Sequence, residues 1–141
     1  MKIAPSILAA DLTDLKNTLI GMSPDAVDFI HIDVMDGHFV PAISFGEAYT
    51  AQVAKHTNIP LDVHLMVSRP EIEIPKYFAF KPFDIVFHLE ATNFPIRLAR
   101  LIQEQGIKAG VALNPGTPCS LPAQTDSFLG KQNRRPLAKE G

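Results

Sequence analysis

Short apolar runs alternate with amphipathic stretches through most of the chain, and this alternation constrains the fold more than any other feature. Runs rich in Ile, Val, Leu and Phe are typical of buried strands. A new run begins about every 25–30 residues, which is the length of one strand followed by one helix. The sequence therefore predicts five strands, at residues 3–8, 28–34, 60–66, 83–89 and 108–113.

Apolar residues at helical spacing predict a helix in each gap between these strands. Asp11 is a candidate N-cap for the first helix, and Gly106 should end the last one. Pro75 lies inside the third helix and should bend or shorten it. The expected helices cover residues 12–22, 46–56, 71–79 and 95–105.

Strand–helix–strand units produce parallel strands, so the expected fold class is α/β. A doubly wound sheet and a (β/α)8 barrel both satisfy this pattern, and the periodicity alone does not choose between them. A complete barrel has eight strands in roughly 250 residues. This chain of 141 residues offers five.

The composition is that of an ordinary globular protein, with 46% hydrophobic and 20% charged residues. A net charge of −2 gives no electrostatic reason to expect nucleic acid or an anionic membrane as a partner. Cys119 is the single cysteine, which excludes an internal disulfide framework and fits a reducing compartment. The first residues do not resemble a signal peptide. We therefore expect a cytoplasmic protein.

The strand–helix pattern stops near residue 118, and the last part of the chain has a different composition. Large apolar residues become sparse there and follow no period. Such a segment buries too little apolar surface to offset the entropy of ordering it. We expect one domain over residues 1–118, followed by a disordered tail over residues 119–141.

Two neighbouring strands carry polar residues at even spacing, which places them on one face of the sheet. Imidazole and carboxylate groups together suit Zn, Fe, Mn or Co better than Mg or Ca. The alternative to metal binding is that these residues have only a structural role in the strands. His88 and Glu90 can orient a metal ligand or serve the fold. The residues that share the face are His31, Asp33 and Met35 on one strand, and Asp62, His64 and Met66 on the next.

Five motifs of the chain, in order and at the expected strand ends, resemble those of the ribulose-phosphate 3-epimerase family. The longest and most specific is HIDVMDGHFVP at residues 31–41. The others are APSILAAD at 4–11, DVHLM at 62–66, FHLEA at 87–91 and NPGT at 114–117. The resemblance covers about residues 1–118.

The resemblance implies a (β/α)8 barrel and an isomerase of the pentose phosphate pathway. Its reaction interconverts D-ribulose 5-phosphate and D-xylulose 5-phosphate through a metal-stabilised enediolate. By the same resemblance His31, Asp33 and His64 are ligands of one divalent metal ion (Zn, Fe, Mn or Co), and Asp33 is also the catalytic base. The implied partner is a small sugar phosphate, with no nucleic acid and no membrane.

The resemblance also implies a substrate-binding set consisting of Ser6, His64, Met35 and Met66. The two methionines would line the site near the reacting carbon, where a soft side chain packs without supplying an acidic proton. Members of the family are often homo-oligomers, so self-association is expected as well.

The sequence departs from the family in its later part. The family's second acid–base carboxylate lies in a Val-Asp-Gly-Gly-type segment, and its phosphate is held by glycine-rich loops; neither is found here. We therefore expect an incomplete barrel of about five βα units with impaired activity, which self-associates through its open strand edges. The alternatives are an inactive metal-binding fragment, a hexulose (allulose) 6-phosphate 3-epimerase and a half-barrel interaction protein.

Overall fold

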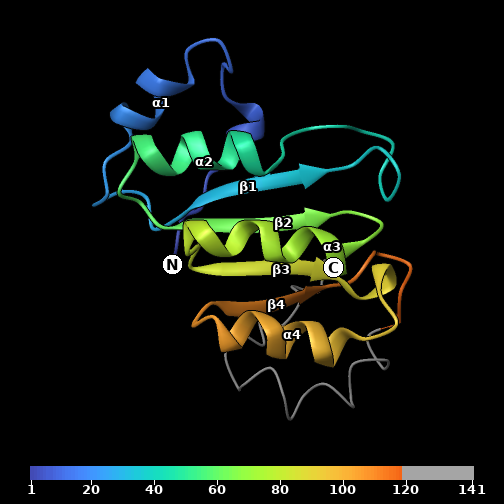
Figure 1. Ribbon diagram of the computed structural model, residues 1–141. Coiled ribbons are helices and arrows are strands. Elements are labelled where there is room, and N and C mark those ends of the chain that lie inside the picture. The colour runs from blue at the N-terminus through green and yellow to red at the C-terminus, as the bar shows by residue number, and fades with distance from the viewer. Residues whose placement is uncertain (119–141) are drawn as a thin grey trace, which may run out of the picture.

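The computed structural model describes residues 1–118, and the tail expected at residues 119–141 lies outside this part (Figure 1). No helix in residues 1–118 is long and apolar enough to cross a membrane. The elements follow in the order η1 (Ile7–Ala9), α1 (Leu15–Gly21), β1 (Ile30–Met35), α2 (Glu47–His56), β2 (Leu61–Met66), α3 (Pro70–Glu73), η2 (Ile74–Phe80), β3 (Asp84–His88), η3 (Leu89–Ala91), α4 (Pro95–Glu104) and β4 (Lys108–Ala112), where η marks a 3-10 helix.

The four strands form one parallel sheet in the order β1-β2-β3-β4, and their arrows all point the same way in Figure 1. Each strand therefore pairs with the one before it, and helices make every crossover. A doubly wound sheet reverses its strand order at a switch point. The order found here runs in one direction only, as in a barrel. The α/β fold class is confirmed, and the strand order favours the barrel.

The first predicted strand, residues 3–8, is wrong as a strand. Only Ser6 makes a bridge, with His31 of β1. Pro5 has no N–H, so the segment offers its carbonyl to the N–H of His31 but cannot continue a regular ladder. The Ser6 Oγ then accepts the N–H of Leu8 and caps the short helix η1. The segment runs beside β1 and turns away after one bridge.

The predicted helices agree with the structure except at the start of α1, which begins at Leu15 and not at residue 12. Asp11 is not its N-cap, because its Oδ1 accepts the N–H and hydroxyl of Thr13 in a local turn. Pro75 acts as expected, since α3 ends at Glu73 and the chain continues as the 3-10 helix η2.

Alternate residues of the strands face the helices and form the core. Each core side chain is less than a tenth exposed. Figure 1 shows α3 and α4 in front of the sheet on this side. The other face of the sheet carries the half-buried polar residues, which is why it can hold a site. The strand residues in the core include Ile30, Ile32, Val34, Leu61, Val63, Leu65, Ile85 and Phe87, and helix residues packed with them include Val53, Ile74, Tyr77, Leu98 and Ile102.

Candidate metal centre

His31, Asp33 and His64 converge on the polar face of the sheet, along the middle of β1 and β2. Asp33 lies directly opposite His64 in the register of the two strands. The Asp33 Oδ1 lies 3.0 Å from the His31 Nε2 and 3.4 Å from the His64 Nδ1. One ligand atom from each of the three residues lies within 4.8 Å of the others. The spacing pattern in the sequence predicted this cluster, and the structure brings it together.

The donor atoms of this cluster fit a divalent transition metal. Two imidazole nitrogens and one carboxylate oxygen are the set that Zn, Fe, Mn and Co accept readily. The three side chains are between 14% and 24% exposed, so an ion can reach them from solvent while the protein excludes part of its water shell. His31, Asp33 and His64 are the residues that would hold it.

His31 is held between two carboxylates. Its Nδ1 lies 2.7 Å from the Asp62 Oδ2, on the strand next to it, while its Nε2 faces Asp33. The hydrogen bond to Asp62 raises the pKa of His31 above its usual value, and partial burial opposes the change. The imidazole therefore has little freedom to rotate away from the cluster.

Asp33 divides its two oxygens between different partners. The Oδ1 faces the histidines, and the Oδ2 accepts the Ser6 hydroxyl at 2.6 Å. The single bridge between Ser6 and β1 brings this hydroxyl to the carboxylate. Asp33 is thus oriented from the side away from the two histidines.

His64 contacts a third histidine on the next strand. Its Nε2 lies 2.9 Å from the Nε2 of His88. Burial and the neighbouring His88 lower the pKa of His64, and burial also lowers that of His88. Both rings are therefore favoured in the neutral form. His64 can then carry its proton on Nε2 and leave the Nδ1, which faces Asp33, unprotonated.

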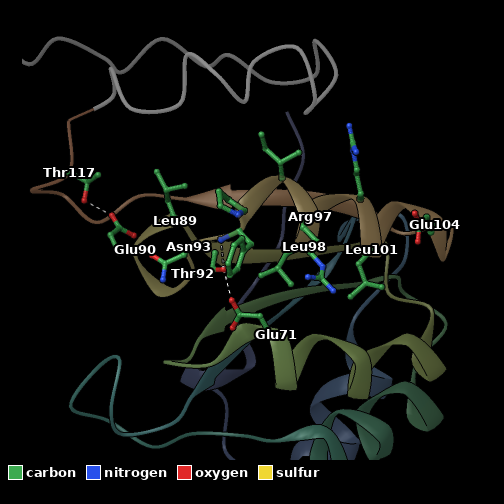
Figure 2. Close-up of a pocket in the computed structure, with 14 residues that line it drawn as sticks. Glu71, Leu89, Glu90, Thr92, Asn93, Arg97, Leu98, Leu101, Glu104 and Thr117 are labelled. Carbon is green, nitrogen blue, oxygen red and sulfur yellow. Dashed lines mark hydrogen bonds between the residues drawn. The ribbon is translucent and has the colours of Figure 1, made fainter.

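Glu90 lies outside the sheet, because β3 ends at His88 and Glu90 belongs to η3. Its Oε2 nevertheless lies 3.6 Å from the His88 Nδ1. Its Oε1 accepts the N–H of Asn114 and the hydroxyl of Thr117, the second of which is drawn in Figure 2. Glu90 thus connects the contacting pair of His64 and His88 to the loop after β4.

The pocket in Figure 2 does not share a lining residue with the His31, Asp33 and His64 cluster. It is lined mainly by η3, α4 and the segment between them. It lies beside Glu90, whereas the cluster lies on the polar face of the sheet. We therefore assign the chemistry to the cluster and not to this pocket.

Met35 and Met66 end β1 and β2, lie opposite each other in register, and are half-buried.

Asp84 was missed by the sequence reasoning. It lies opposite Asp62 in register, on the polar face, and burial together with the Asp62 charge raises its pKa to about 7. The even spacing of Asp84, Val86 and His88 on β3 is the signal that could have revealed it.

A parallel sheet of βα units whose strand order never reverses, with a cluster of potential metal ligands on one face, is the architecture of part of a (β/α)-barrel protein. The sequence profile of the ribulose-phosphate 3 epimerase family matches residues 2–128. The chain belongs to this family, and the resemblance seen in its motifs is confirmed.

Proteins named ribulose-phosphate 3-epimerase are similar to this chain in distant organisms. The one from Bacillus subtilis (strain 168) is 50% identical over 119 residues, which are 84% of this chain and 54% of the relative. The one from Methanocaldococcus jannaschii is 44% identical over 84% of this chain and 50% of its own length. The one from Mycobacterium bovis is 42% identical over 82% of this chain and 50% of its own length. The chain thus spans about half the length of the curated relatives it matches.

Proposed function

We propose that this chain carries the metal-binding and proton-abstracting part of a sugar-phosphate 3-epimerase acting on D-ribulose 5-phosphate and D-xylulose 5-phosphate. The observation that carries the proposal is the convergence of His31, Asp33 and His64 around the Asp33 Oδ1. Membership of the family, and the names of the relatives, support the substrate class. The divalent metal (Zn, Fe, Mn or Co) and a cytoplasmic location belong to the same proposal.

Asp33 is the proposed base. The Ser6 hydroxyl donates to one of its oxygens, which fixes the plane of the carboxylate. The ionised carboxylate can take the C3 proton next to a ketone. A divalent ion held by the cluster would supply Lewis acidity that lowers the energy of negative charge on the sugar oxygens.

Four residues around the base are the proposed substrate contacts. Ser6 and His64 touch Asp33 directly and offer polar groups to the sugar. Met35 and Met66 lie at the strand ends beside them and offer apolar, polarisable surface to a planar intermediate. This set places polar recognition and apolar packing on the same face of the sheet.

Inversion at C3 needs proton removal on one face of the carbon and return on the other. Asp33 supplies one such group within residues 1–118. One base acting alone can remove and return a proton on its own face, which exchanges hydrogen with solvent and leaves the configuration unchanged. The reaction can therefore be divided into a step that Asp33 performs and a step that needs a second group.

The test is hydrogen exchange at C3 in deuterated water, followed by proton NMR on D-ribulose 5-phosphate and D-xylulose 5-phosphate separately. With Zn, Mn or Co present, we expect one of the two sugars to lose its C3 proton faster than the other epimer forms. Asp33→Asn should abolish this exchange, since a positioned general base contributes about 10²–10⁴-fold. Asp25→Asn, which changes an exposed carboxylate in the turn before β1, is the matched control and should exchange normally.

Exchange of neither sugar above the Asp33→Asn background would overturn the proposal. Epimer formation as fast as deuterium entry would overturn the single-base division, because it would require a second acid–base group. The D-allulose 6-phosphate reaction, assayed in the same way, tests whether the site prefers a hexulose phosphate.

A further inference from the structure

His31 makes a short side-chain contact with Asp62 on the neighbouring strand. The His31 Nδ1 lies 2.7 Å from the Asp62 Oδ2, and the two residues are register partners on β1 and β2. The opposite ring nitrogen, Nε2, is the one directed at Asp33. Asp62 thus contacts the ring nitrogen of His31 that lies opposite to the one facing Asp33.

We propose that Asp62 is a positioning residue that keeps the proton of His31 on Nδ1 and so presents an unprotonated Nε2 to the metal site. The inference rests on the metal site of the proposed function, but not on the sugar reaction. Asp62 itself contributes no ligand atom to the cluster.

The tautomer argument follows from the donor and acceptor properties of the two side chains. A neutral imidazole carries one N–H, and only the nitrogen without it can bind a metal. An ionised carboxylate can only accept hydrogen bonds, so the contact of Nδ1 with Asp62 and that of Nε2 with Asp33 each need a proton on the nitrogen. A metal ion bound at Nε2 would replace the proton on that side and leave the one that Asp62 holds on Nδ1. The same contact makes the ring a better ligand, because the carboxylate stabilises positive charge on it.

The other oxygen of Asp62 lies against β3. Its Oδ1 is buried, and the side chain of Asp84 lies against it from β3. Asp62 therefore cannot easily rotate to release His31. Residues of β2 and β3 therefore both help to orient His31, which lies on β1.

The first experiment measures zinc affinity by competition with a chelator on the full chain. Removal of the carboxylate in Asp62→Leu should weaken zinc binding about 10–100-fold, the usual cost of losing such a partner. Asp62→Asn should weaken it less, because its amide oxygen can still accept from Nδ1–H. Asp25→Asn is the control, since it changes an exposed carboxylate in the turn before β1, and its zinc affinity should be unchanged.

The second experiment reads the tautomer in the unsubstituted chain and does not depend on whether a variant folds. Long-range ¹H–¹⁵N NMR of the zinc-loaded chain should show His31 protonated at Nδ1 and without a proton at Nε2. A proton on Nε2, or equal zinc affinities for Asp62→Leu and the unsubstituted chain, would overturn the inference. Zinc binding with the expected tautomer but without C3 exchange would support it and overturn the proposed sugar reaction.

Discussion

Ser6 and Asp33 are 27 residues apart in the sequence, and the Ser6 hydroxyl donates a hydrogen bond of 2.6 Å to the Asp33 Oδ2. This bond depends on the single bridge between Ser6 and His31, after which the chain turns into η1. One bridge to β1, without a regular strand, is therefore enough to bring a hydroxyl to the proposed base.

Ser6→Ala should slow Asp33-dependent C3 exchange and leave the fold intact. The variant removes a donor to an ionised carboxylate, a contact worth about 1.5–3 kcal/mol, so we expect a rate loss on the order of tenfold or more. NMR exchange in deuterated water measures it. Ser23→Ala, at an exposed serine before β1, is the control. Unchanged exchange in Ser6→Ala would show that the hydroxyl has no part in positioning the base.

His88→Phe should weaken zinc binding about tenfold, because it removes the acceptor that faces the His64 Nε2. Phe keeps the ring volume and the contact with Phe39. His88→Gln, which restores an acceptor oxygen, should recover part of the affinity. Chelator competition measures all three proteins. Equal affinity in His88→Phe and the unsubstituted chain would favour a purely structural role for His88.

The even spacing in β1 and β2 was enough to predict the cluster, because a strand places alternate residues on one face whatever surrounds it. The contact between His31 and Asp62 could not be predicted in the same way, since it needs the register of two strands. Asp84 was missed for a related reason. An aspartate at the start of an apolar run gives no sign of burial until its neighbouring strand is in place.

The predicted start of α1 and the first predicted strand were wrong for local reasons. Asp11 satisfies its side chain in a turn with Thr13 and so is not available as a helix cap. Ser6 instead accepts the N–H of Leu8 and caps η1, so the chain turns where the strand was expected to continue. Short polar side chains that bond to nearby backbone compete with regular structure, and the sequence alone does not say which outcome prevails.

The unfolding free energy of the metal-free chain should contain a component from Asp84 that falls as the pH rises. The pKa of Asp84 is raised from 3.8 to about 7, so the folded chain binds this proton more tightly than the unfolded chain. The stabilisation is therefore fully present below about pH 4 and is lost as the pH rises through about 7. Allowing for solvent screening of this partly buried group, it is on the order of 1 kcal/mol.

Urea unfolding at several pH values between 4 and 8 measures this component, with Asp84→Asn as the comparison. The variant is neutral throughout and still offers a donor to Asp62, so its stability should fall less over this range. Parallel pH profiles for the two proteins would contradict the prediction. Asp25→Asn, at an exposed site, controls for the general effect of removing one negative charge.

We also predict that the chain self-associates through the outer edge of β4. Among residues 1–118, β4 pairs with β3 on one side, and no strand of this part covers the other. An edge with unpaired backbone groups is a template for another strand. The edge of β1 differs, because the Ser6 segment bridges to it and then turns away. Association should therefore involve β4 first.

Size-exclusion chromatography over a range of concentrations should show elution shifting toward larger species as the concentration rises. Amide exchange should then show the β4 amides becoming more protected with concentration. β2 lies inside the sheet and provides an internal reference whose protection should not change. A compact monomer at every concentration, with β4 amides as protected as those of β2, would contradict the prediction. It would also mean that something other than a second chain covers this edge.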